Sequence, residues 1–301
     1  MRKPFLAKCA NRKELAKQHP LGGPETWFSR DVLADHEVYG FTFDFFVKWN
    51  TTPVTLTSEV WVKRILEARD ELIDCSLEDV SRKLYLCDTE EYVRNLAQFT
   101  SGNNMSLKYY IFADEVDWDR QPETIYSLEL SNDGEVIDME SFTVTDVMKR
   151  IQINSGGPIS VGSKGLIYGT SSLEGYLSKT TAAWPGDVDL VLTNRAGVPI
   201  GLLEYKKHTL SDSIRDQHLS KYYPYPDARK YNRLQVLAER LKVPIVIIYY
   251  PTKPYFTEIK IERIGGTFGN LTSLESVYCD IPKNNRQKSE LMGITLQLAG
   301  I

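Results

Sequence analysis

Two consecutive apolar segments near the middle of the chain contain charged residues, and this pattern strongly constrains the fold. Residues 184–192 read Trp-Pro-Gly-Asp-Val-Asp-Leu-Val-Leu and include Asp189. Residues 201–207 read Gly-Leu-Leu-Glu-Tyr-Lys-Lys and include Glu204 and Lys206. A charge inside an apolar strand is costly unless something compensates it. The fold must therefore supply a bound ion, a ligand or an opposite charge at this point.

The spacing of these charges predicts that they share one face of a β-hairpin. Side chains alternate across a strand, so Glu204 and Lys206 point to the same side. A turn at Ala196-Gly197 would place Asp189 opposite Glu204, and opposite residues of an antiparallel pair also share a face. The sequence therefore predicts a sheet face with two carboxylates and an ammonium group.

This combination of groups indicates phosphodiester hydrolysis. Carboxylates are the oxygen ligands that Mg²⁺ takes, and the ion keeps waters that phosphate oxygens can replace. Bound metal ions lower the pKa of an attacking water and stabilise the attacking and leaving oxygens. Lys206 would orient or help to deprotonate that water and stabilise negative charge. We therefore expect a Mg²⁺-dependent hydrolase in which Mn²⁺ can substitute.

The Asp189…Glu204-x-Lys206 pattern, in its setting of apolar strands, resembles the PD-(D/E)XK, or restriction-endonuclease-like, nuclease superfamily. The resemblance implies an α/β fold with a mixed sheet and an αββαβ core. Periodicity and turn signals predict the corresponding elements here. They are a helix near 171–181, strands at 187–193 and 198–206, a helix at 227–241 and a strand at 243–250.

The resemblance also implies the roles of individual residues. Asp189, Glu204 and the backbone carbonyl of Tyr205 would bind the metal, and Glu174 would add a catalytic and metal-binding acid from the preceding helix. Two alternatives stay open. Glu174 could be an ordinary helix-surface residue close to a serine cap, and Asp187, in Pro-Gly-Asp, competes with Asp189 as the principal metal ligand.

Basic residues are concentrated after the proposed catalytic lysine. Residues 201–242 hold nine Lys or Arg against five Asp or Glu, an excess of +4 in a chain whose net charge is −4. A phosphate backbone would lie beside such a surface, although a solvated helix of mixed charge gives the same count. The candidate nucleic-acid contacts are Lys207, His208, Gln217, Arg229, Lys230 and Arg233. Gln217 is followed five residues later by Tyr222, one residue longer than the Gln-x-x-x-Tyr of one branch of the superfamily, so an exposed helical glutamine is an alternative reading.

The remaining sequence predicts a mixed α/β N-terminal region, residues 1–155, which could serve target recognition or dimerisation, and a nuclease domain, residues 156–301. The break is placed at Asn-Ser-Gly-Gly-Pro, 154–158, and no internal repeat is evident. The expected strands are 39–49, 109–113, 125–130 and 135–139, and the expected helices are 59–74, 89–99, 143–151 and 211–221. The stretch after Gly265, including the basic run 283–288, is expected to be a loop or turn.

Composition narrows the class of protein. Charged residues make up 25% and hydrophobic residues 42% of the 301 residues, which is typical of a globular protein. The four cysteines lack zinc-ligand spacing, and neither an apolar leader nor a membrane-spanning run is present. We therefore expect a cytoplasmic protein with reduced thiols that does not enter a membrane.

The expected function is cleavage of DNA by a restriction or defence-type endonuclease, with RNA left open as a substrate. A homodimer is expected because a double-strand cut needs two sites. The alternatives are a repair or recombination nuclease acting on branched or single-stranded DNA, and an inactive nucleic-acid-binding module on the same fold. An unrelated α/β protein, in which Glu204 and Lys206 form a surface ion pair, is a further reading.

Overall fold

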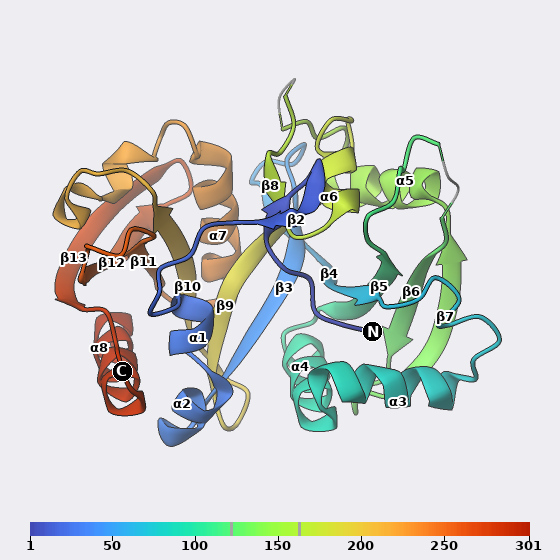
Figure 1. Cartoon of the computed structure of the whole chain (residues 1–301), viewed down its shortest axis with the longest axis horizontal. Coiled ribbons are helices and arrows are strands. Elements are labelled where there is room, and N and C mark those ends of the chain that lie inside the picture. Colours follow the sequence, from blue (N-terminus) through green and yellow to red (C-terminus); the bar gives the residue numbers. More distant parts are fainter. Residues whose placement is uncertain (121–122, 162–163) are drawn as a thin grey trace. The chain divides into compact units, whose positions relative to one another are not determined.

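The computed structural model describes residues 1–120, 123–161 and 164–301, and its fold is mixed α/β, as expected (Figure 1). The chain forms two compact units. Unit 1 comprises residues 1–16 and 43–187, and unit 2 comprises residues 17–42 and 188–301. The boundary expected near residue 155 therefore falls inside unit 1. The chain enters the main segment of unit 1 at Phe43 and returns to unit 2 at Val188.

Unit 1 is built on strands that run in the spatial order β3-β4-β5-β6-β7. The β4–β5 pair is parallel, and the other neighbours are antiparallel. The strands are β3 (Val38–Lys48, its later residues in this unit), β4 (Thr55–Leu66), β5 (Ser106–Ala113), β6 (Ile125–Leu130) and β7 (Val136–Phe142), beside a small sheet of β1 (Ala7–Lys8), β2 (Asn11–Leu15) and β8 (Tyr168–Gly169). The helices are α3 (Leu77–Asp88), α4 (Glu90–Gly102), α5 (Val144–Ser155) and α6 (Ser172–Leu177).

Unit 2 is built on strands in the order β9-β10-β11-β12-β13. Here β10–β11 is parallel and the other neighbours are antiparallel. The strands are β9 (Gly186–Asn194, from Val188 onward in this unit), β10 (Pro199–His208), β11 (Ile245–Pro251), β12 (Glu258–Thr267) and β13 (Asn270–Asp280). The helices are α1 (Pro24–Trp27), α2 (Arg30–Asp35), α7 (Ala228–Leu241) and α8 (Asn285–Ala299), with two 3-10 turns, η1 (Ile214–Asp216) and η2 (Leu219–Lys221).

The two units repeat one arrangement of elements. In each, an antiparallel pair leads through a helical connection to a parallel partner, two antiparallel strands follow, and a helix ends the series. In unit 1 the series is β3-β4-α3-α4-β5-β6-β7-α5, and in unit 2 it is β9-β10-α7-β11-β12-β13-α8. The sequence does not reveal this repeat, because equivalent strands such as β4 (TLTSEVWVKRIL) and β10 (PIGLLEYKKH) share their place in the sheet order and not their residues.

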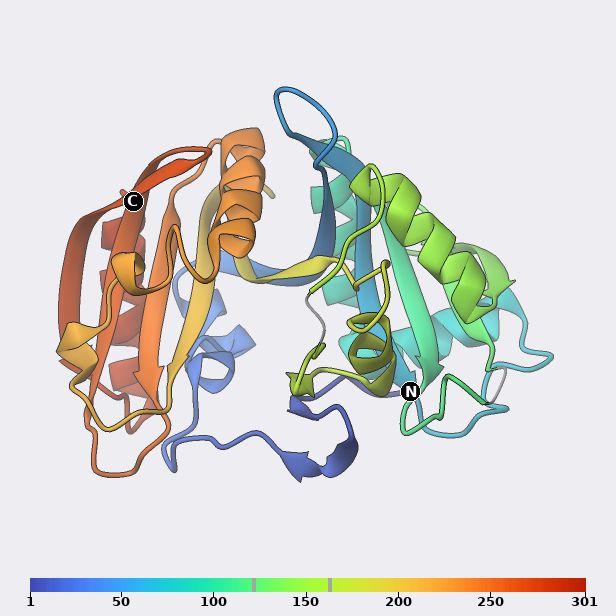
Figure 2. The same cartoon turned by 90° about the horizontal axis from the view of Figure 1, so that it is seen from above.

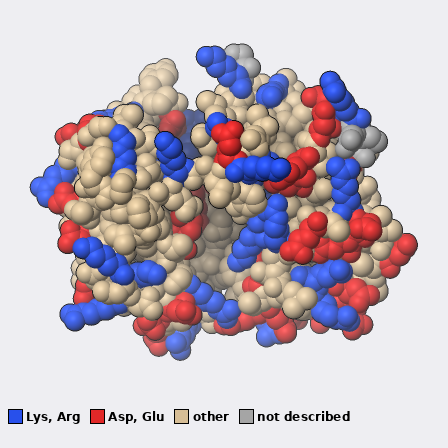
Figure 3. Space-filling view, viewed as in Figure 1, with Lys and Arg blue, Asp and Glu red and all other residues tan. Residues whose placement is uncertain are grey.

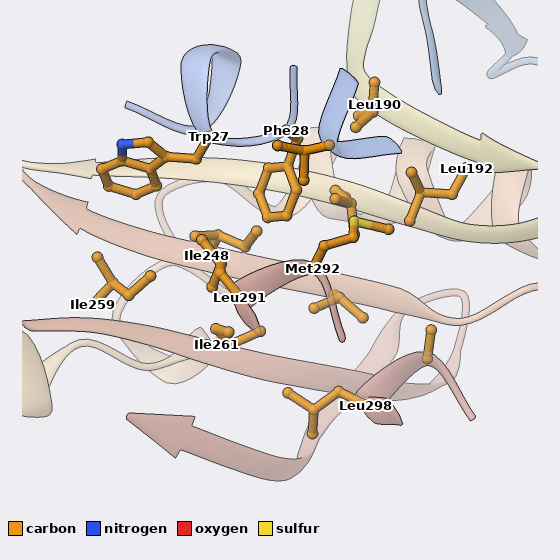
Figure 4. Close-up of a cluster of buried hydrophobic side chains, with 14 of the residues drawn as sticks. Trp27, Phe28, Leu190, Leu192, Ile248, Ile259, Ile261, Leu291, Met292 and Leu298 are labelled. Atoms are coloured by element: carbon orange, nitrogen blue, oxygen red, sulfur yellow. The ribbon is translucent and has the colours of Figure 1, made fainter. Parts of the chain in front are cut away.

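The repeat is completed by an exchange of helices. Helices α1 and α2 precede β3 in the chain but belong to unit 2, whereas α6 precedes β9 but belongs to unit 1. In unit 2, Trp27 and Phe28 join the core cluster drawn in Figure 4, together with Leu291 and Met292 of α8. In unit 1, Leu173 and other residues of α6 pack in the same way with those of α5. Each unit therefore takes the helix that precedes the first strand of the other.

The two faces of the sheet of unit 2 differ, since one is apolar and packs with α8, whereas the other carries the hairpin charges among buried apolar residues such as Val191, Leu202 and Ile247. Leu190 and Leu203, opposite one another on β9 and β10, join the cluster that includes α8. Because side chains alternate along a strand, Asp189 and Glu204 belong to the other face, on which α7 packs (Figure 2). The apolar face anchors the hairpin and so fixes the position of the charged face.

The structure confirms several predicted elements. The strands 39–49, 109–113, 125–130 and 135–139, the helices 89–99, 143–151 and 227–241, and the hairpin at Ala196-Gly197 all form. The helix predicted at 59–74 is wrong, because residues 59–66 belong to β4 and residues 67–74 form bends and turns. The β4 residues Val60, Trp61, Val62 and Ile65 are buried, and a strand covered on both faces loses the alternation that would distinguish it from a helix.

Other segments also differ from expectation. The helix predicted at 211–221 is only the two turns η1 and η2, and the helix near 171–181 is the shorter α6. The basic run 283–288 is not a loop, since Asn284 caps α8 by accepting a hydrogen bond from the Gln287 backbone. Helix α3 was not expected at all. Within the described residues, no helix is both long and apolar enough to cross a membrane.

Candidate carboxylate–lysine site

Asp189 lies at the point where β9 stops pairing with β10. The last paired residues are Leu190 and Leu203, and one step beyond them the Tyr205 backbone N–H donates to Asp189 Oδ2 at 2.6 Å. The Asp189 carboxylate therefore accepts the Tyr205 backbone hydrogen bond that a backbone carbonyl of β9 would accept if the pairing continued. A strand residue directs its N–H and C=O to the same side, so the Tyr205 carbonyl is directed to the side of Asp189.

Glu204 is the most deeply buried charge of the predicted set. Its residue is 1% exposed, and an ion pair joins its Oε1 to Lys230 Nζ of α7. Among the described residues, neither Glu204 oxygen accepts a hydrogen bond of good geometry. A buried carboxylate is normally satisfied by several donors. The Lys230 ammonium is therefore the group that compensates the buried charge of Glu204.

Lys206 is held in place by an acid and an aromatic ring. Its Nζ forms an ion pair with Asp227 at the start of α7, and it lies 4.0 Å from the centroid of the Tyr222 ring. Both contacts hold the ammonium group in a defined position. Because Glu204 and Lys206 each pair with α7, they do not neutralise one another, and the surface ion pair considered as an alternative is absent from the contacts of the described chain.

Gln217 binds the tyrosine whose ring lies against Lys206. Its side chain is not exposed, as one reading held, but 2% exposed. The Tyr222 hydroxyl donates to Gln217 Oε1 at 2.6 Å, and Gln217 Nε2 donates to Asp212 at 3.2 Å. The longer Gln-to-Tyr spacing is thus compatible with a direct bond, because the intervening chain forms the turn η2. Gln217 fixes the ring on which Lys206 rests.

A buried network of hydrogen bonds and an ion pair on the neighbouring strands β11 and β12 holds the segment that contains Gln217 and Leu219. Glu262 of β12 accepts hydrogen bonds from the Tyr249 hydroxyl at 2.7 Å and from the Leu219 backbone N–H of η2 at 3.0 Å. Lys260 pairs with Glu262 at 3.3 Å and donates to the Gln217 carbonyl at 2.6 Å. These contacts tie the segment that precedes α7 to the sheet.

Glu174 lies in unit 1, whereas Asp189, Glu204 and Lys206 lie in unit 2. Glu174 Oε2 accepts from the Thr170 backbone at 2.6 Å and hydroxyl at 2.8 Å, and the Ser171 hydroxyl accepts from the Glu174 backbone N–H. These are the capping contacts of the alternative interpretation.

A second charged cluster in unit 1 accounts for Asp187. Asp44 pairs with Lys63 at 3.3 Å and accepts from the Trp184 indole at 2.9 Å, and Lys63 lies 3.9 Å from Glu174. Burial, opposed by Lys63 and reinforced by Asp187, raises the pKa of Asp44 to about 6. Asp187 thus acts on this cluster in unit 1, and Asp189 is the aspartate adjoining Glu204.

The residues predicted to contact nucleic acid have different environments. His208 is buried, with Nε2 2.8 Å from the Asp212 carbonyl oxygen, and Gln217 is buried as described above. Lys207 is half-buried, and burial lowers its pKa, opposed by the charge of Glu25 in α1. Arg229 is exposed, and Arg233 and Lys230 are half-buried. On the face shown in Figure 3, acidic and basic side chains are interspersed and form no extended basic surface.

The carboxylate set fits a hard divalent cation through particular groups. Asp189, Glu204 and the Tyr205 carbonyl offer the oxygen ligands that Mg²⁺ prefers, and such an ion would take the place of the Lys230 ammonium in compensating the buried Glu204 carboxylate. In residues 1–120, 123–161 and 164–301, no three or more His, Cys, Asp or Glu side chains are grouped to hold a metal.

The partners of the predicted charges were not anticipated, although Lys230 was expected as a nucleic-acid contact. Asp227 and Lys230 pair with the predicted lysine and glutamate, while Lys260 and Glu262 support them from β12. The buried charges of Ile-Lys-Ile-Glu, 259–262, alternate with apolar residues, and that signal resembles the one at Glu204 and Lys206. The partners themselves could not be read from the sequence, because they lie far along the chain.

A cavity of about 530 Å³ lies in unit 1 and contains none of the predicted site residues. Its lining includes Cys9, Trp118, Tyr176 and Lys179. The charged face of unit 2 is therefore the candidate site because of its chemistry and not because of its concavity.

No protein-family model matches this chain, and neither the curated proteins nor the solved structures contain a match to it.

Proposed function

We propose that unit 2 is a metal-dependent phosphodiesterase that cleaves DNA, of the restriction or defence type, and that Asp189, Glu204 and Lys206 form its active site. The observation that carries the proposal is the buried Glu204 carboxylate, which lacks well-formed hydrogen bonds and adjoins both Asp189 and an oriented lysine. The resemblance to PD-(D/E)XK nucleases supports the same assignment.

In this proposal each residue has a separate task. Asp189, Glu204 and the Tyr205 carbonyl would hold Mg²⁺ or Mn²⁺, which supplies an activated water and stabilises phosphoryl charge when bound. Lys206 would place its positive charge against the phosphoryl oxygens, in a position preset by Asp227 and Tyr222. Because Asp227 and Tyr222 already hold the Lys206 ammonium in place, little entropy would be lost in ordering this side chain when the substrate binds.

The repeat of the arrangement in unit 1 raises the question whether one protein chain has one or two active sites, and so whether it could cut one or both strands of a DNA duplex. In unit 1, the β4 residues that alternate with Trp61 are Val60, Val62 and Arg64, and Arg64 is paired with Asp88 of α3. This face has no counterpart of the Glu204-x-Lys206 pair. A single chain would therefore cut one strand, and a double-strand cut would need two chains, which supports a homodimer on DNA as part of the proposal.

A cleavage assay tests the function. Supercoiled plasmid, single-stranded DNA and RNA would be incubated with the protein in Mg²⁺, Mn²⁺ or EDTA, beside Lys206→Ala and the matched surface variant Lys283→Ala. We expect metal-dependent cutting of plasmid by the parent protein and Lys283→Ala, and loss of cutting in Lys206→Ala. Preference for single-stranded or branched DNA would favour a repair enzyme. No cutting by the folded parent protein in either metal would refute the proposal.

The Lys230 contact favours one other candidate, a binding module without catalysis. A lysine that permanently neutralised Glu204 would keep a cation away while leaving a basic helix for nucleic acid. That protein would bind DNA in EDTA and in Mg²⁺ with equal affinity and would show no metal binding by calorimetry.

A further inference from the structure

The start of α7 presents two opposite charges to the two charges of β10. Asp227 and Lys230 are three residues apart, so they are neighbours on one helix face, and Glu204 and Lys206 are two apart on one strand face. The pairs are crossed in sign: Asp227 meets Lys206, and Lys230 meets Glu204. One helical turn therefore controls both charges of the proposed active site.

Lys230 connects a buried group with the surface. Its side chain is 31% exposed, while that of Glu204 is 1% exposed. Among the described residues, Lys230 is the one cation in ion-pair contact with Glu204. Lysine carries a compact, strongly hydrated charge on a flexible four-carbon stem, so this ammonium can exchange the carboxylate for an anion in solvent without movement of the helix.

An ammonium on Glu204 and a divalent cation on the same carboxylate exclude one another, because the two positive charges would repel at contact distance. We propose that Lys230 is a substrate-controlled switch: it holds Glu204 in the free protein and transfers to a backbone phosphate of duplex DNA, which opens Glu204 to the divalent cation. The proposal rests on the proposed function and adds that metal is taken up together with DNA.

Thermodynamic linkage gives the switch a measurable signature. If DNA removes Lys230 from Glu204, DNA must tighten metal binding, and the metal must tighten DNA binding by the same factor. Without the lysine, the metal no longer competes with an ammonium, so the free protein should bind it more tightly. The coupling between metal and DNA should then shrink.

Calorimetry in the absence of nucleic acid measures how much the loss of Lys230 tightens metal binding by the free protein. The probe is Ca²⁺, which takes the same oxygen ligands as Mg²⁺. We expect Lys230→Gln to bind Ca²⁺ about tenfold more tightly than the parent protein, within the usual range of such couplings. Lys230→Arg, which retains the charge, and Lys283→Gln, which removes a charge elsewhere in unit 2, should bind like the parent. Thermal stabilisation by Ca²⁺ should rank the variants in the same order even if Lys230→Gln is less stable.

Fluorescence polarisation with duplex DNA in EDTA and in Ca²⁺ measures the coupling. The gain in DNA affinity on adding Ca²⁺ should be smaller in Lys230→Gln than in the parent protein. Equal Ca²⁺ affinity of the parent and Lys230→Gln would overturn the switch alone, provided that the parent still binds Ca²⁺ and cuts DNA. Absence of Ca²⁺ binding in the parent and in every variant would overturn both the switch and the proposed function.

Discussion

Replacing Glu262 by alanine should destabilise unit 2 severely, although Glu262 is not a proposed catalytic residue. The side chain is 1% exposed and its carboxylate serves four partners. It accepts from the Tyr249 hydroxyl, the Leu219 backbone and the Ser273 hydroxyl, at 2.7, 3.0 and 2.8 Å, and pairs with Lys260 at 3.3 Å. One substitution therefore breaks contacts that reach three separate segments.

The magnitude follows from what the substitution leaves behind. The Lys260 side chain is 5% exposed, and removing one partner of a buried ion pair costs about 3–5 kcal/mol because the other charge stays buried. Each further donor left without an acceptor costs about 1–3 kcal/mol, and relaxation of the site recovers part of this. We therefore expect Glu262→Ala to lower the free energy of unfolding by about 3–5 kcal/mol. Glu262→Gln, which keeps an acceptor, should cost less.

Urea unfolding followed by tryptophan fluorescence measures this loss, since unit 2 contains Trp27. Hydrogen exchange of the β11 and β12 amides would assign the loss to unit 2. Glu275→Ala is the matched control, because Glu275 is exposed on the adjacent strand β13 and should change stability by no more than about 0.5 kcal/mol. A cost below about 1 kcal/mol for Glu262→Ala would refute the reasoning that this network holds η2 and Tyr249 in place.

Three further outcomes test other parts of the structure. Because burial raises the pKa of Asp44 from 3.8 to about 6, the folded state binds its proton more tightly. The resulting stability is full below pH 3.8 and lost as the pH rises through 6. The stability of the parent relative to Asp44→Asn, from urea unfolding, should therefore fall across that window, and a difference independent of pH would contradict it. Tyr222→Phe leaves the buried Gln217 oxygen without its donor and should cost about 1–3 kcal/mol; an unchanged melting temperature would count against this bond. Ser171→Ala removes the cap of α6 and should cost about 1 kcal/mol, and an unchanged thermal midpoint would refute the capping role of Ser171.

The hairpin shows why part of the site was readable from the sequence. Asp189, Glu204 and Lys206 lie on adjoining strands joined by a short turn, so strand alternation and one turn position were enough to place them together. The helix α7 was equally readable, from its periodicity and its position before a strongly apolar strand. Local periodicity and turn chemistry fixed these elements because no distant segment was needed to define them.

The helices α1, α2 and α6 show where such reasoning ends. Helix α6 precedes β9 directly, so chain order suggested that it would belong to the same compact unit as the hairpin. The structure instead assigns α6 to unit 1 and gives α1 and α2 to unit 2. Which helix covers a sheet face depends on the fit of apolar surfaces, here Trp27 and Phe28 against the cluster that includes Leu203, and this fit is not encoded in neighbouring positions.

The sequence by itself determined the α/β class, the charged hairpin and the helix–strand unit that follows it, because each depends on residues close together in the chain. Tertiary structure alone decided the repeat of one arrangement in two units, the exchange of their first helices, and the partners of the buried charges. Asp227, Lys230 and Glu262 meet the hairpin or its supports only after α7 and β12 pack on β10 and β11. Long-range packing chooses among many possible partners for a buried charge, and the one that compensates it is fixed only when the chain has folded.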